Sequence, residues 1–172
     1  MGRSLSISMN TQQQDNYLVF RERAQAFCQI VESAAGLERK TFLDLLETTL
    51  AQVYAAAVVL PFVEPATSDV PDSCFAVEQW SGLWQTLRDK LGAADSYREV
   101  FDPTEKEEAI DMSLSQDIAE IYQDLKEALE IEKLGIQQAD LHWDWNHEFR
   151  NHWGKHALNA LNALHWHIYW CH

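Results

Sequence analysis

The segment from residue 138 to residue 170 contains no proline and only one glycine, Gly154. Within it, the stretch ALNALNAL at residues 157–164 has only Asn159 and Asn162 as polar residues. A helix that is apolar around most of its circumference is buried on most sides. At about 1.5 Å per residue, a helix over the whole segment would be about 45 Å long, unless Gly154 bends it. The sequence therefore predicts an all-α fold with a long, largely buried C-terminal helix.

Four further helices are predicted from apolar residues that recur at three- and four-residue steps, the spacing of one helical face. They cover approximately residues 16–35, 38–60, 75–91 and 113–134. Ser113 or Ser115 is the expected N-cap of the fourth helix. No strand is predicted, and the acidic segment at residues 104–111 is expected to form a loop or turn. The predicted fold is a single-domain helical bundle of about five main helices over residues 16–172, preceded by a flexible N-terminal tail at residues 1–15.

The charge and cysteine content limit the classes of partner and compartment. The formal net charge of −14 repels phosphate backbones, so nucleic acid is not an expected partner. The longest apolar run, at residues 53–63, contains Pro61 and is too short to cross a bilayer, so no membrane segment is expected. Cys28, Cys74 and Cys171 are widely spaced and form no CxxC motif, which favours a reducing compartment, the bacterial-type cytoplasm. Cys28 is expected to be buried and Cys171 exposed.

All seven histidines lie in the last part of the chain, between residues 142 and 172. Asp144, Glu148, His152 and His156 follow one another at four-residue intervals, so they share one face of the predicted helix. This spacing can present two imidazoles and a carboxylate to one metal ion.

The predicted helix at residues 113–134 is the expected source of further ligands. Its carboxylates Asp117, Glu120, Asp124 and Glu127 recur at three- and four-residue steps along one edge of its apolar face. Metal sites in helical bundles are built from inward carboxylates and histidines on facing helices. The candidate site for a divalent metal ion thus consists of Asp117, Glu120, Asp124, Glu148, His152 and His156. The Glu-x-x-His motif of di-iron bundles is absent from residues 138–170, and no other cofactor is indicated.

His156 is the most specific of these residues because it projects onto the apolar face of its helix. A buried imidazole needs hydrogen-bond partners, and Asp117 or Asp124 is predicted to supply one across the helix interface. Such a pair either fixes the register of two packed helices or serves as a ligand or proton-transfer pair, and the sequence leaves both interpretations open. Gly154 is expected to allow another helix to approach closely.

Three segments, VFDPTEKEEA, SLSQDIAEIYQDLKEAL and WDWNHEFRNHWGKHALNALNALH, resemble a bacterial family catalogued as domain of unknown function 5063. The resemblance covers the chain after the N-terminal tail and is clearest from Tyr97 to His165. It implies a helical cytosolic bacterial protein, and it implies no activity. The positions that match the family pattern are Asp102, Pro103, Asp117, Asp124, Leu125, Phe149, Trp153, Gly154 and His156.

Three hypotheses about function follow, and whether the protein is an enzyme stays open among them. The first is a binding or adaptor protein whose acidic surface and aromatic C-terminus contact a protein partner or a second copy of the chain. The alternative is a metal-dependent helical hydrolase, in which the candidate site activates water for attack on a phosphorylated small molecule. In the third, the polar pairs only specify packing, and the activity lies with a partner. No nucleophile motif or phosphate-binding glycine loop occurs in the sequence.

Overall fold

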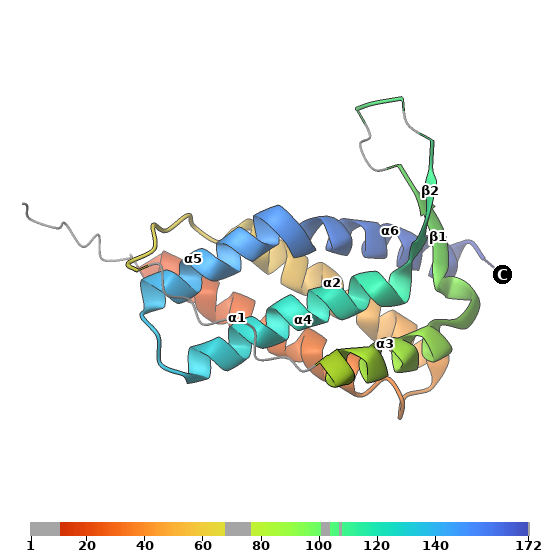
Figure 1. Cartoon of the computed structure of the whole chain (residues 1–172), viewed down its shortest axis with the longest axis horizontal. Helices are drawn as coiled ribbons and strands as arrows, with labels where there is room; N and C mark the ends of the chain where they lie inside the picture. The colour runs from red at the N-terminus through yellow and green to blue at the C-terminus, as the bar shows by residue number, and fades with distance from the viewer. Residues whose placement is uncertain (1–10, 68–76, 101–103, 107, 172) are drawn as a thin grey trace, which may run out of the picture.

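The computed structural model describes residues 11–67, 77–100, 104–106 and 108–171, and at residues 77–80 it describes the backbone alone. The helices are α1 (Thr11–Glu32), α2 (Arg39–Val58), α3 (Val77–Leu91), α4 (Leu114–Lys133), α5 (Gln138–Glu148) and α6 (Gly154–Tyr169) (Figure 1). A π-helical turn, Phe149–Trp153, joins α5 to α6, so these elements form one long C-terminal helix. The predicted helical fold with its long C-terminal helix is therefore confirmed. Cys74, Asp102 and Pro103 lie outside the described residues.

The helices pack lengthwise around a common apolar core. Helix α4 contacts α1, α3, α5 and α6, and α2 lies against α1 and α6 (Figure 1). The core includes large side chains that are almost completely buried, among them Phe20, Phe27, Leu46, Ile118 and Trp153. None of the described helices is long and apolar enough to cross a bilayer. Burial of this apolar surface is the main force that holds the bundle together.

The C-terminal part of the long helix buries one face. In α6 this face consists of Ala157, Ala160, Ala163 and Leu164. The small alanine side chains let the backbone of α6 lie close to α2 and α4. On the opposite side, Leu158 is 51% exposed. Cys28 in α1 is buried and Cys171 after α6 is exposed, as predicted.

Helix α1 begins at Thr11, inside the segment that was predicted to be a tail. Its first turns are polar and lack the apolar periodicity that marks a helix. They are held in place by hydrogen bonds to the end of α2 and the segment that follows. Asn16 Nδ2 donates to the Val59 carbonyl at 3.1 Å, and Tyr17 Oη donates to the Pro61 carbonyl at 2.9 Å.

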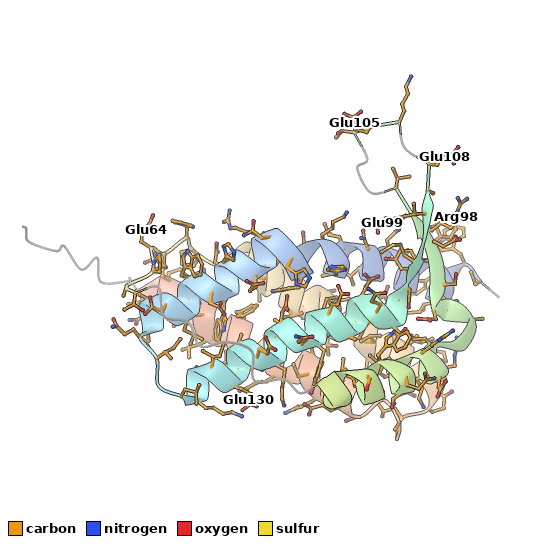
Figure 2. The ribbon with its side chains drawn as sticks, viewed as in Figure 1. Glu64, Arg98, Glu99, Glu105, Glu108 and Glu130 are labelled. Atoms are coloured by element: carbon orange, nitrogen blue, oxygen red, sulfur yellow. The ribbon has the colours of Figure 1, made fainter. Side chains whose placement is uncertain are left out.

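Two short strands form a hairpin, although no strand was predicted. Strand β1 (Ser96–Glu99) pairs antiparallel with β2 (Ile110–Ser113), and Ser96 lies opposite Ser113. Each strand has only four residues, too few for a two-residue alternation to be recognised in the sequence. Figure 2 shows the hairpin standing away from the bundle, with Arg98 and Glu99 near its base and Glu105 and Glu108 towards its tip.

The base of the hairpin fixes where α4 begins. Ser113 is the N-cap, and its Oγ accepts a hydrogen bond from the Gln116 N–H at 3.4 Å, which confirms one of the two predicted caps. Asp95, just before β1, accepts the Ser115 N–H through Oδ1 at 2.7 Å and the Leu114 N–H through its carbonyl at 2.7 Å. These bonds satisfy N–H groups of the first turn of α4 and set the rotation of the helix. Asp117 is thereby placed on the buried side of its first turn.

Candidate metal centre

His156 of α6 lies between two carboxylates of α4. Its Nδ1 is 2.8 Å from Asp117 Oδ1, and its Nε2 is 2.9 Å from Glu120 Oε2. Asp117 is only 1% exposed, whereas the His156 side chain is 23% exposed. Of the two partners considered for His156, the structure places Asp117 beside it.

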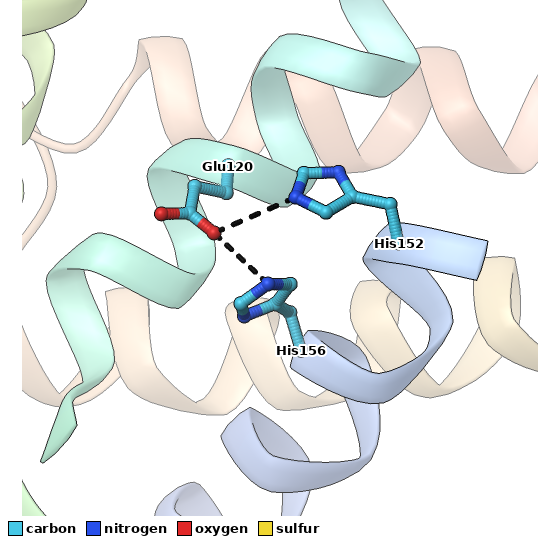
Figure 3. A group of neighbouring side chains, drawn as sticks. All are labelled: Glu120, His152 and His156. Atoms are coloured by element: carbon cyan, nitrogen blue, oxygen red, sulfur yellow. Dashed lines mark ion pairs between the residues drawn. The ribbon is translucent and has the colours of Figure 1, made fainter. Parts of the chain in front are cut away.

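His152, four residues earlier in the chain, also has a carboxylate of α4 next to each of its ring nitrogens. Its Nδ1 is 2.6 Å from Asp124 Oδ2, and its Nε2 is 3.8 Å from Glu120 Oε2. Both imidazoles therefore turn Nε2 towards the same carboxylate oxygen of Glu120, as Figure 3 shows. The ligand atoms of Glu120, His152 and His156 lie within 4.8 Å of one another. This group of Glu120, His152 and His156 is the candidate metal centre.

The π-helical turn carries His152 and depends on Gly154. The Gly154 N–H donates to the Phe149 carbonyl, five residues earlier, which is the hydrogen bond that defines a π turn. A Cβ atom at position 154 would collide with that carbonyl and lie 3.0 Å from two carbons of the Phe149 ring. The sequence pointed to a neighbouring helix at Gly154, whereas the atoms nearest to a Cβ there belong to Phe149 of the same helix.

Two residues that the sequence did not single out hold the carboxylates in position. Tyr97 of β1 donates from Oη to Asp117 Oδ2 at 2.5 Å, so the hairpin contacts the site through a buried carboxylate. Burial and this bond to Asp117 raise the pKa of Tyr97, which therefore stays protonated as a donor. Gln116 Nε2 donates to Glu120 Oε1 at 2.9 Å and leaves Oε2 facing the imidazoles. Gln116 lies four residues before Glu120, a pairing that helical spacing can reveal, whereas nothing local marks Tyr97.

The two hydrogen bonds of His156 determine its charge. The bonds to Asp117 and Glu120 raise the pKa of His156 to about 10, and the bond to His156 lowers the pKa of Glu120. The metal-free site thus holds an imidazolium between two carboxylates. Burial raises the pKa of Asp124 to about 6. A divalent cation at the centre would take the place of the proton on His156 Nε2.

Glu148 lies on the other side of His152. The ligand atoms of Asp124, Glu148 and His152 form a second group within 4.8 Å of one another. Burial and the neighbouring Glu148 raise the pKa of Asp144, the first member of the four-residue series, to about 6. The structure therefore brings all six predicted site residues to the interface of α4 with the C-terminal helix. They do not form one set of six ligands, because Asp117 and Asp124 engage the Nδ1 atoms.

Comparisons with known proteins identify relatives but no activity. Residues 11–170 match the family described as Domain of unknown function (DUF5063). The chain is similar to a solved structure, the structural-genomics target BF1032 from Bacteroides fragilis, with 28% identity and a TM-score of 0.79. That similarity covers 90% of this chain and 93% of the other. The comparison with curated proteins gave no match.

Proposed function

The chain belongs to the family described as Domain of unknown function (DUF5063), whose description assigns no activity, and we propose that it binds one divalent metal ion at Glu120, His152 and His156. The observation that carries this proposal is the orientation of the two imidazoles. Each has Nδ1 bonded to a carboxylate and Nε2 turned towards Glu120. Metal-bound histidines are typically oriented in this way, since the carboxylate fixes the tautomer and leaves Nε2 free for the ion.

The separations of the ligand atoms support the proposal. Bonds of about 2.1 Å in tetrahedral geometry place ligand atoms about 3.4 Å apart. Glu120 Oε2 is 2.9 Å from His156 Nε2 and 3.8 Å from His152 Nε2, on either side of that value. Small side-chain rotations are enough to equalise these distances. Two imidazoles and one carboxylate favour zinc or a similar transition metal over magnesium or calcium.

Three protein ligands leave a coordination position for water. The His152 side chain is 44% exposed, so this position faces solvent. An ion with an open position lowers the pKa of its bound water to about 7, and hydrolysis is the reaction type that such a centre supports. A phosphorylated small molecule is the substrate class we expect, because the ion would offset its negative charge at an acidic surface.

The test is metal binding by purified protein, with matched histidine variants. We expect calorimetric titration with Zn²⁺ to give one site per chain and Zn²⁺ to raise Tm, since a ligand that binds only the folded state stabilises it. His156→Ala and His152→Ala should lose both effects, whereas His165→Ala, which removes an exposed histidine paired with Glu47, should keep them. Binding that persists in both site variants would contradict the proposal. The same would follow from wild-type protein that shows neither binding nor a rise in Tm.

A second candidate function is protein binding through the end of α6. Trp166, Tyr169 and Trp170 are 56%, 54% and 66% exposed, and the two indole rings lie 5.5 Å apart. Exposed aromatic side chains of this kind are typical of interfaces with a partner or a second copy of the chain. Sedimentation analysis of the wild type and of a Trp166→Ser, Trp170→Ser variant tests this candidate. A wild type that sediments as the same monomer as the variant would count against self-association through these residues. We propose that the protein acts in the cytoplasm, where the buried thiol of Cys28 stays reduced.

A further inference from the structure

A pocket of about 330 Å³ lies between α1 and α5. The first turns of these two helices lie at the end of the bundle opposite the hairpin (Figure 1). Its walls include Tyr17, Leu18 and Arg21 of α1 and His142 and Trp145 of α5. Its volume is at the lower end of the range for small-molecule sites. The pocket shares no residue with the candidate metal centre, so it would serve a separate purpose.

Three residues that line this pocket carry buried nitrogen atoms without a hydrogen-bond partner in the described part of the chain. These atoms are Arg21 Nε, His142 Nδ1 and Trp145 Nε1. His142 is only 7% exposed and Trp145 only 3%. Each buried polar group without a partner destabilises the folded protein, and native proteins keep few of them. All three atoms belong to residues that line one pocket, so small rotations of these side chains would let a molecule in the pocket supply the partners.

The charge of the walls narrows the class of molecule. Glu132 of α4 also lines the pocket and pairs with Arg21 Nη1 at 3.3 Å, so these two charges cancel. Burial lowers the pKa of His142 to about 4, so the imidazole is uncharged at neutral pH. A carboxylate in the pocket would add an uncompensated charge next to Glu132. The walls therefore favour an uncharged ligand.

The shape and chemistry of the walls narrow the class further. Tyr17 and His142 stack at 3.4 Å between ring centroids with an interplanar angle of 6°, and the Trp145 ring lies 6.3 Å from Tyr17. Aromatic walls favour a flat ring. The indole and guanidinium N–H groups need an acceptor, while a neutral imidazole nitrogen either donates or accepts, depending on its tautomer. An amide meets both needs, because its oxygen accepts and its nitrogen donates.

We propose that the pocket between α1 and α5 binds a small, flat, uncharged molecule that carries an amide or lactam group. The amide oxygen accepts hydrogen bonds from Trp145 Nε1 and Arg21 Nε, and the amide nitrogen pairs with His142 Nδ1. Binding of this molecule needs no metal ion, so the proposal stands or falls independently of the metal centre.

Nicotinamide and nicotinate are matched probes, since they share a ring and differ in the amide and the carboxylate. The indole N–H signal of Trp145, assigned from the spectrum of Trp145→Phe, is followed by NMR while each probe is added to the full chain in chelator. We expect a saturable shift with nicotinamide in the millimolar range and little shift with nicotinate. Arg21→Lys keeps the charge next to Glu132 and removes the Nε donor, so binding should weaken by about fivefold.

Trp143→Phe is the control for Trp145→Phe, because Trp143 lies on the same helix and stacks on His147 at 4.6 Å, away from the pocket. The control should bind nicotinamide like the wild type. If Trp145→Phe fails to fold, the Trp145 signal is assigned from triple-resonance spectra of the wild type, and Arg21→Lys, which changes a partly exposed side chain, supplies the variant test. Absence of any saturable shift at Trp145 with nicotinamide would overturn the proposal. Equal binding of nicotinate would overturn the assignment to an uncharged amide.

Discussion

Asp117→Asn replaces one oxygen atom beside the candidate metal centre by an NH₂ group and tests how Asp117 controls His156. Asp117 accepts from Tyr97 Oη and lies 2.8 Å from His156 Nδ1. In the variant, the amide oxygen remains with Tyr97, because the Tyr97 hydroxyl is a donor there. The NH₂ group then faces His156 and can only donate. His156 Nδ1 must become the acceptor and lose its proton, so the remaining imidazole proton lies on Nε2, the atom that we propose as the ligand.

The size of the effect follows from these bonds. Loss of a carboxylate that orients a metal-bound histidine weakens metal affinity by about 10- to 100-fold, or about 1.4–2.7 kcal/mol. Without metal, the variant loses a hydrogen bond to a charged group at a carboxylate that is 1% exposed, which costs about 2 kcal/mol. For a chain of 172 residues that cost lowers Tm by about 4–8 °C.

The assay combines competition for Zn²⁺ against a chelator dye, melts in chelator, and nitrogen-15 NMR of the imidazole to identify the tautomer. Asp89→Asn is the control, because it makes the same change of charge at an exposed position of α3 and should bind Zn²⁺ like the wild type. Suppose that NMR places the proton on Nε2 and Zn²⁺ still binds with wild-type affinity. His156 would then not be a ligand, and the proposed role of Asp117 would be wrong.

Three further predictions concern the helix, the pocket and the loop after α2. Gly154→Ala should destabilise the metal-free protein by about 1–3 kcal/mol, because its Cβ collides with the Phe149 carbonyl, and melts in chelator measure this loss. The same variant should weaken Zn²⁺ binding, which a zinc titration measures. The pKa of His142 is lowered from 6.5 to about 4, so the folded state binds fewer protons than the unfolded state between these values. Stability should thus be full above pH 6.5 and fall by about 2–3 kcal/mol as the pH decreases to 4, whereas urea unfolding of His142→Phe should lack this dependence. Asp140 Oδ1 accepts the Thr67 N–H at 2.8 Å, so Asp140→Ala should speed amide hydrogen exchange at Thr67 by about tenfold or more; an unchanged rate would show that this bond does not hold the loop.

The helices could be predicted from the sequence because each buries a periodic apolar face. The Ser113 cap could be predicted as well, since its hydrogen bond is local. The hairpin and the first turns of α1 could not, because they depend on contacts with distant residues. Asn16 bonds to Val59, and the start of β1 lies next to Asp95, which holds the first turn of α4. No window of the sequence contains both partners of such contacts.

The candidate site divides in the same way. Four-residue spacing was enough to place His152 and His156 on one side of a helix, and the carboxylates of α4 were recognised as the facing residues. The pairing of each histidine with its carboxylate depends on the register between two helices, which the sequence does not specify. In the structure, Asp117 lies next to His156, and Asp124 lies next to His152.

The π-helical turn explains why a series of four-residue steps stays at one interface. In an α-helix each residue turns by about 100°, so each four-residue step drifts by about 40° around the axis. The three steps from Asp144 to His156 would drift by about 120°, which would turn one end of the series away from α4. The π turn at residues 149–153 holds an additional residue in its turn and so reverses part of this drift. Gly154 permits that turn, and the geometry of the candidate metal centre therefore depends on a residue that is not a ligand.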